Sequence, residues 1–197
     1  MTIRAGRLRL RFGYPAAAAI CACAVVLGER YPAALLCAVI HEAGHIAALL
    51  RFGQERIDIR LRVTRTDIID SGKGSRPDRQ QALVSLARPL ANAAASPLFY
   101  ALYASAACPF LLDCAMISAA LCVFNLLPMF GTDGGELAAI ALSRRLSEKA
   151  AHNIMTALTG FFLLPVFAAS FYALLRTGSN VSLLIFAFAA AAEGFSK

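Results

Sequence analysis

Long apolar runs are the feature that most restricts how this 197-residue chain can fold. A helix that crosses a lipid bilayer needs about 20 consecutive, mostly apolar residues. Hydrophobic residues make up 59% of the chain and charged residues 16%, whereas soluble domains contain about 45–50% and about 25%. We therefore predict an all-α polytopic membrane protein, a single domain over residues 1–197, with about six transmembrane helices. The apolar runs are Tyr14–Leu27, Tyr31–Leu50, Ala82–Ala107, Phe110–Leu127, Ile154–Leu175 and Val181–Ala192.

The charged residues indicate how these helices are oriented. Nineteen basic residues against twelve acidic ones give a net charge of +7. The basic residues gather before the first apolar run and between residues 51 and 79, and loops rich in Lys and Arg stay on the cytoplasmic side. With an even number of spans, both termini are then cytoplasmic. Because membrane topology accounts for the basic balance, we expect a lipid bilayer as partner and no nucleic acid.

The segment Gln54–Ile69 has a different pattern from the apolar runs. Apolar Ile57, Ile59, Leu61 and Val63 alternate with mostly charged residues. A period of two predicts a strand, so we expect a small β-hairpin-like insert after the second helix. Two interpretations of this insert stay open. It is either an amphipathic hairpin on the membrane surface or an exposed edge that pairs with an extended substrate segment.

Residues 41–45 form a complete H-E-x-x-H pattern inside the second apolar run. On a helix, positions four apart lie on one face, so the imidazoles of His41 and His45 can share one zinc ion. Glu42 lies beside them, where its carboxylate can take a proton from a water molecule and pass it to a leaving amine. An ionisable residue in the middle of a membrane helix costs about 2.5–3.5 kcal/mol, so this group indicates a function.

A catalytic zinc ion needs a third protein ligand and an open position for water. The candidate is Asp133, which lies in Asn125–Gly135, where Pro128 and the glycines break the helix at membrane depth. Broken backbone is tolerated there only when it is buried in protein or lines a wet cavity. We interpret His152 as an interfacial polar residue. Glu136 is either a helix-start carboxylate or the hydrogen-bond partner of a ligand imidazole.

These motifs resemble those of the site-2 protease family of intramembrane zinc metalloproteases. That family has H-E-x-x-H on one span and N-x-x-P-x-x-x-x-D-G on a later one, and both are present here in that order. The resemblance implies one zinc ion per chain, with Glu42 as the catalytic base. The zinc ligands that it implies are His41, His45 and Asp133.

A third segment, Ala87–Asn92, is similar to the family's G-P-x-x-N sequence. The likeness implies that Asn92 stabilises the oxyanion or orients the substrate. The chain departs from the family pattern at Arg88, which replaces the usual glycine, and at residues 130–132, which replace a proline-rich lead into Asp133. These departures bear on the substrate gate more than on the metal site.

The resemblance further implies regulated intramembrane proteolysis, in which a peptide bond in or near a transmembrane segment of a membrane-tethered protein is hydrolysed. The short chain is most similar to the branch that processes transcription-factor precursors in spore-forming bacteria. This similarity implies a bacterial cell membrane and is compatible with a regulatory partner in that membrane. Two alternatives stay open. The chain could be a metal-binding transporter or sensor, or an inactive homologue that binds membrane-tethered clients without cutting them.

Overall fold

The computed structural model describes residues 2–5, 8–12, 28–53, 57–61, 66–70 and 77–177. The chain divides into two compact units, Met1–Asn125 and Leu126–Lys197, and each unit is described by itself. The predicted spans Tyr14–Leu27 and Val181–Ala192 lie outside the described residues. The single domain and the count of six spans therefore stay predictions.

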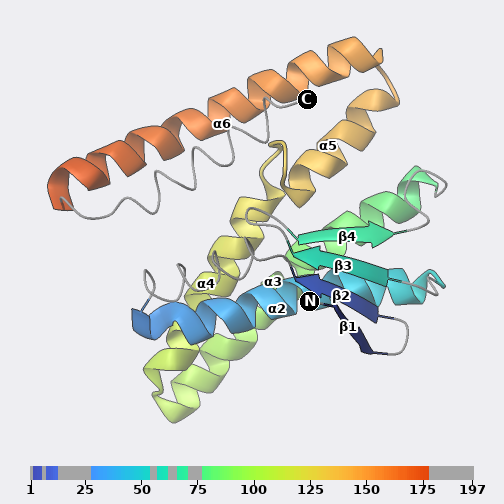
Figure 1. Ribbon diagram of the computed structural model, residues 1–197. Coiled ribbons are helices and arrows are strands. Elements are labelled where there is room, and N and C mark those ends of the chain that lie inside the picture. The colour runs from blue at the N-terminus through green and yellow to red at the C-terminus, as the bar shows by residue number, and fades with distance from the viewer. Residues whose placement is uncertain are drawn as a thin grey trace. The chain divides into compact units, whose positions relative to one another are not determined.

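Helices of the first unit correspond to three of the predicted runs (Figure 1). Pro32 stands in the first turn of the second helix, where its missing N–H removes no helix hydrogen bond. The third helix is capped by Ala107, which has a φ of 51° and donates its backbone N–H to the Tyr103 carbonyl. These elements are a 3-10 turn η1 (Gly28–Arg30), α2 (Tyr31–Arg51), α3 (Asp78–Ala106) and α4 (Pro109–Leu126).

The first unit also contains a four-stranded sheet with the strand order β1-β2-β3-β4 (Figure 1). β1 pairs antiparallel with β2, and β3 pairs antiparallel with β4. β2 runs parallel to β3, with Leu10 opposite Ile59. Parallel neighbours need a crossover connection, and here that connection includes α2. The strands are β1 (Thr2–Ala5), β2 (Leu8–Phe12), β3 (Ile57–Leu61) and β4 (Thr66–Asp70).

This sheet corrects two expectations from the sequence. The predicted fold class has no strands before the first apolar run, yet Leu8, Leu10 and Phe12 alternate with arginines and form β2. The arginines carry a strand pattern as well as a topology signal. One of the two interpretations of Gln54–Ile69 gives its alternating part an open edge, but β3 in that part lies between β2 and β4. Among the described residues, the edges of the sheet are β1 and β4.

The second unit contains α5 (Asp133–Ser143) and α6 (Glu148–Thr177). α6 includes the predicted run Ile154–Leu175 and begins with a polar turn. α5 has 11 residues, about half of what a membrane crossing requires, so no apolar run predicts it.

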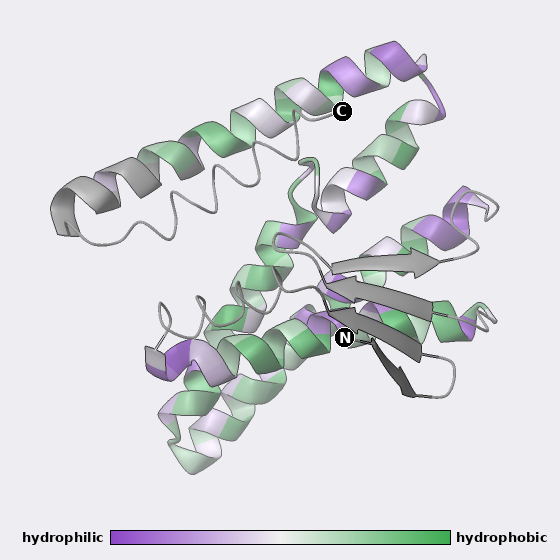
Figure 2. Cartoon of the chain, in the orientation of Figure 1, coloured by the Kyte–Doolittle hydropathy of each residue, from purple (hydrophilic) through white to green (hydrophobic). Residues whose placement is uncertain are grey.

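Two of the described helices are long and apolar enough to cross a membrane, namely Gly28–Arg51 and Pro109–Leu126. Figure 2 shows hydrophobic residues along the middle of α2, α3 and α4, while hydrophilic residues gather around η1 and between α5 and α6. Large apolar side chains are exposed on these helices, among them Val39, Leu98 and Val123. Exposed apolar side chains of this size are expected where a helix faces lipid.

One face of α2 is buried against its neighbours, at every fourth residue. This face holds Cys37, which is fully buried together with Cys114 of α4. The Cys37 thiol donates to the Cys114 carbonyl (3.3 Å), and the Ser118 hydroxyl donates to Cys37 Sγ (3.2 Å). Both cysteines are free and act as small packing residues. The buried face of α2 consists of Ala33, Cys37, His41, His45 and Leu49.

Candidate metal centre

Both histidines of the H-E-x-x-H pattern lie on the buried face of α2. His41 is 8% exposed and His45, four residues later, is 7% exposed. Buried imidazoles need hydrogen-bond partners, because an unsatisfied buried polar group costs about 1–3 kcal/mol. The neighbouring helix α3 supplies those partners.

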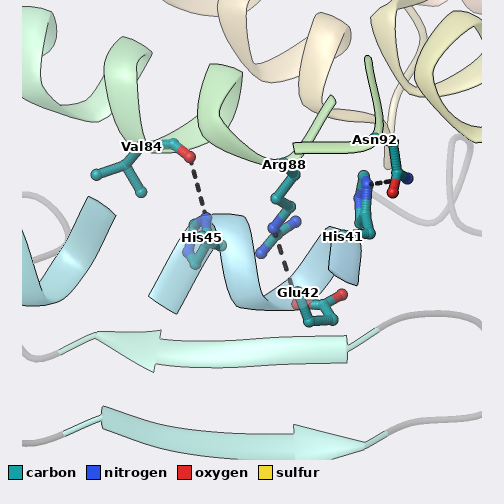
Figure 3. Close-up of polar contacts among 6 residues, drawn as sticks. All are labelled: His41, Glu42, His45, Val84, Arg88 and Asn92. Atoms are coloured by element: carbon teal, nitrogen blue, oxygen red, sulfur yellow. Dashed lines mark hydrogen bonds and ion pairs between the residues drawn. The ribbon is translucent and has the colours of Figure 1, made fainter. Parts of the chain in front are cut away.

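Three successive turns of α3 contact the H-E-x-x-H pattern (Figure 3). The contacting residues of α3 stand four apart and therefore share one face of that helix. The two helices run in opposite directions, so the first contacting residue of α3 meets the last residue of the pattern. The contacts join His45 Nδ1 to the Val84 carbonyl oxygen (3.2 Å), Glu42 Oε2 to Arg88 Nε (3.8 Å), and His41 Nδ1 to Asn92 Nδ2 (3.2 Å).

Small residues let α2 and α3 approach closely at this level. A Cβ added to Gly44 would lie 2.5 Å from the Ala87 carbonyl oxygen and 2.8 Å from the Ala91 Cβ. Any side chain at position 44 would therefore force the helices apart. Pro89 is fully buried in α3, and a proline distorts the helical turn before it. The turn comes directly after Val84, whose carbonyl oxygen contacts His45 of α2.

The contact of His45 with α3 determines which of its ring nitrogens carries the proton. A carbonyl oxygen can only accept, so Nδ1 of His45 carries the proton and donates it to Val84. Nε2 then keeps its lone pair. Metal-binding histidines in proteins almost always donate their other ring N–H to a carbonyl or carboxylate in this way. His45 therefore fits a metal ligand that binds through Nε2.

Arg88 lies opposite Glu42 and is the residue that departs from the family pattern. Its side chain is 18% exposed and that of Glu42 is 28% exposed. Arginine stays charged under all ordinary conditions, and a mostly buried guanidinium needs an opposite charge nearby. The sequence interpretation connects Arg88 with the substrate gate, whereas the geometry connects it with the Glu42 carboxylate.

In the second unit, Asp133 is 3% exposed and occupies the first position of α5. Thr132 caps this helix, because its side-chain oxygen accepts a hydrogen bond from the Gly135 N–H (3.0 Å). The hydroxyl group also lies 2.6 Å from the Leu127 carbonyl. These hydrogen bonds fix the start of α5 and with it the position of Asp133.

The two glycines after Asp133 fold the preceding loop tightly against the start of α5. A Cβ on Gly134 would lie 2.2 Å from the Leu126 carbonyl oxygen, and one on Gly135 would overlap the Met129 carbonyl oxygen. Gly131 has a φ of +88°, which other residues rarely adopt. This chain therefore builds its lead into Asp133 from a left-handed glycine and a threonine cap instead of prolines.

The remaining candidates lie around this loop. Phe130 donates its N–H to the Thr159 hydroxyl (2.9 Å), and its ring lies 5.5 Å from that of His152. His152 is exposed, as expected for an interfacial residue. Glu136 lies in the first turn of α5, and its backbone N–H is donated to the Thr132 carbonyl (3.1 Å).

Sequence reasoning missed one residue of this arrangement. Val84 contributes a main-chain carbonyl, so its residue type carries no chemical signal. Only its spacing from Arg88 and Asn92 on α3 points to it. Within the described ranges, no three or more His, Cys, Asp or Glu residues gather into a group able to hold a metal ion. His41 and His45 belong to the first unit and Asp133 to the second.

Comparison with known proteins gives two matches and one negative result. Residues 79–166 match the model of peptidase family M50. No curated protein matches the chain. Among solved structures, the chain is similar to the site-2 protease from Methanocaldococcus jannaschii, with a TM-score of 0.68 and 17% sequence identity, over 98% of this chain and 95% of that one. At this identity the likeness shows the fold.

Residues 79–166 thus match a peptidase family, and the fold of the chain is similar to that of a site-2 protease. The family match takes in Asn92 and Asp133 but begins after the H-E-x-x-H pattern. The two histidines therefore depend on their sequence pattern and on their contacts with α3. The family match indicates a peptidase, and two of the described helices, α2 and α4, are long and apolar enough to cross a membrane.

Proposed function

We propose that this protein is a zinc-dependent intramembrane metalloprotease. It hydrolyses a peptide bond in or near a transmembrane segment of a membrane-tethered protein substrate. The observation that carries the proposal is the contact between His45 Nδ1 and the Val84 carbonyl, because a metal-binding histidine typically donates its other ring N–H to a carbonyl in this way. The family match and the fold support the same reaction class.

The proposed zinc ligands are His41, His45 and Asp133. Two imidazoles and one carboxylate are a common donor set for catalytic zinc, with a fourth position open to water. When bound, the ion supplies Lewis-acid activation of water and of the peptide carbonyl. The low exposure of all three side chains keeps bulk water away from these donors.

Glu42 is the proposed general base. Its carboxylate takes a proton from the attacking water and delivers it to the leaving nitrogen of the peptide. The Arg88 guanidinium, 3.8 Å away, holds the carboxylate on the side of α2 that faces α3. A metal transporter or sensor would use the same histidines but would not need a positioned base, so this contact favours the enzyme over that alternative. The complete ligand set favours an active enzyme over an inactive homologue.

Metal content and cleavage test this function together. Protein purified in detergent without chelators should contain about one zinc ion per chain, because three protein ligands form a catalytic site. Co-expression with candidate membrane-tethered proteins should release a fragment of one of them. Folded protein with a zinc content near zero would overturn the assignment.

The sheet offers a way to hold the substrate extended. Helical substrates hide their carbonyls in intrahelical hydrogen bonds, so a protease must unwind them, and an exposed strand edge can pair with an unwound segment. The interior position of β3 moves this role to the outer edge of β4, since β4 is an edge strand within the described residues. In chain order, β4 is followed by α3, which makes the contacts to the H-E-x-x-H pattern.

A proline scan of β4 tests this role. Successive residues of a strand point their N–H groups alternately to the two sides, and proline removes one N–H. Prolines at Asp67, Ile68 and Ile69 should therefore alternate in effect. The set facing outwards should impair cleavage with zinc content unchanged, and the set facing β3 should lower protein yield. Ile3→Pro in β1, at the opposite edge, is the matched control and should leave cleavage intact. Equal cleavage by all β4 variants would show that substrate does not pair there.

A further inference from the structure

Asn92 makes a contact whose chemistry the packing of α2 and α3 does not explain. Its side chain is completely buried. Nδ2 of Asn92 lies 3.2 Å from Nδ1 of His41, while its Oδ1 has no hydrogen-bond partner in the described part of the chain. A half-turn of the amide about its last side-chain bond exchanges the two atoms. The same side chain can therefore present either a donor or an acceptor to His41.

The two orientations of the amide have opposite consequences for metal binding. A neutral imidazole has one N–H and one lone pair. If Asn92 donates through Nδ2, Nδ1 of His41 is the acceptor and the proton stays on Nε2, which then cannot bind a metal ion. If Asn92 accepts through Oδ1, Nδ1 carries the proton and Nε2 offers its lone pair. Only the second orientation gives the buried oxygen a partner.

We infer that Asn92 is a positioning residue that accepts a hydrogen bond from His41 and thereby presents Nε2 of His41 to the zinc ion. The inference rests on the proposed zinc site. His45 is oriented in the same way by the Val84 carbonyl. α3 thus orients both histidine ligands, one through its main chain and one through a side chain. This role differs from the oxyanion role that the resemblance implies, in which Asn92 must donate to the substrate.

Zinc affinity separates the two roles without any need for a substrate. The probe is Zn²⁺ alone, measured on the full chain in detergent by competition with a coloured chelator. Asn92→Leu removes the acceptor, so zinc affinity should fall by about 10–100-fold, the usual effect of losing such a partner. Asn92→Asp keeps an acceptor at the same place but has no N–H, so its zinc affinity should stay within about threefold of wild type.

Two additions keep the test sharp. Ser96→Ala is the matched control, because Ser96 lies one turn further along α3 and bonds to the Ala115 carbonyl (2.9 Å) rather than to a histidine. Its zinc affinity should equal that of wild type. Asn92→Ala serves as a second variant without an acceptor, if Asn92→Leu does not fold. The absorption spectrum of the Co²⁺-loaded protein should change in the variants that lack the acceptor and stay the same in Asn92→Asp.

The possible outcomes are distinct. Weakened zinc binding in Asn92→Leu with near-normal binding in Asn92→Asp supports the positioning role. Wild-type zinc affinity in Asn92→Leu, or equal weakening in both variants, overturns it. A wild-type protein that binds no zinc contradicts the proposed function instead.

Discussion

Glu42→Gln should abolish cleavage while the protein keeps its zinc. A glutamine amide has almost the size of the carboxylate and leaves both imidazoles in place, but it cannot accept the proton of the attacking water. General acid–base catalysis contributes about 10²–10⁴-fold to the rate, so cleavage of a co-expressed substrate should fall by that factor. The measurements are the fraction of substrate cleaved and the zinc content of the purified variant.

The control for this substitution has to account for Arg88. Glu42→Gln removes the charge opposite a mostly buried guanidinium, so some loss of thermal stability is expected. A thermal melt and the zinc content together distinguish a lost base from a lost fold. Glu29→Gln makes the same chemical change at an exposed position in η1 and should leave cleavage and zinc unchanged. Normal cleavage by Glu42→Gln would show that another group is the base.

The helices could be predicted from apolar runs, but their ends could not. Hydropathy marks the stretch that lipid accepts, whereas a helix continues as long as its backbone hydrogen bonds do. α3 therefore begins at Asp78 rather than at Ala82, and α6 begins at Glu148 rather than at Ile154. The short α5 has a cap and two closely packed glycines as its signature, and neither is apolar.

Two long-range contacts show which segments outside the helices lie on the same side of the molecule, and no local sequence pattern reveals such contacts. β2 and β3 are hydrogen-bonded neighbours, so residues 8–12 and 57–61 must lie on the same side of the membrane. Arg30 before α2 and Asp113 near the start of α4 form an ion pair of 3.5 Å, so these two loops also share a side. Which side faces the cytoplasm stays a prediction.

The site shows a similar division between what residue types reveal and what only geometry reveals. The H-E-x-x-H spacing predicted two histidines on one face of a helix, and α2 confirms that they share its buried face. The partners on α3 were harder to find. Arg88 departs from the family pattern, so the sequence alone offered no partner for it. Pairing a residue of α2 with one of α3 depends on how closely the helices approach, and Gly44 sets that distance.

Asp133, the proposed third zinc ligand, is held in place by three features of its own unit. The Thr132 cap fixes the start of α5, Gly134 and Gly135 let the loop pack against that start, and the side chain is 3% exposed. A carboxylate held in this way has little freedom to move, as a metal ligand requires.

Asp133→Ala should therefore lose both zinc and cleavage. A catalytic zinc site with only two protein ligands is incomplete, and loss of even an outer partner weakens zinc binding about 10–100-fold, so zinc content should fall below about a tenth of wild type. Metal analysis of the purified variant and the cleavage assay give the readouts. Asp113→Asn, at a partly exposed aspartate outside the motif, is the control and should keep both properties. If Asp133→Ala retained zinc and activity, the third ligand would lie elsewhere, and Glu136 and His152 would be the next residues to replace, because both lie near the same loop.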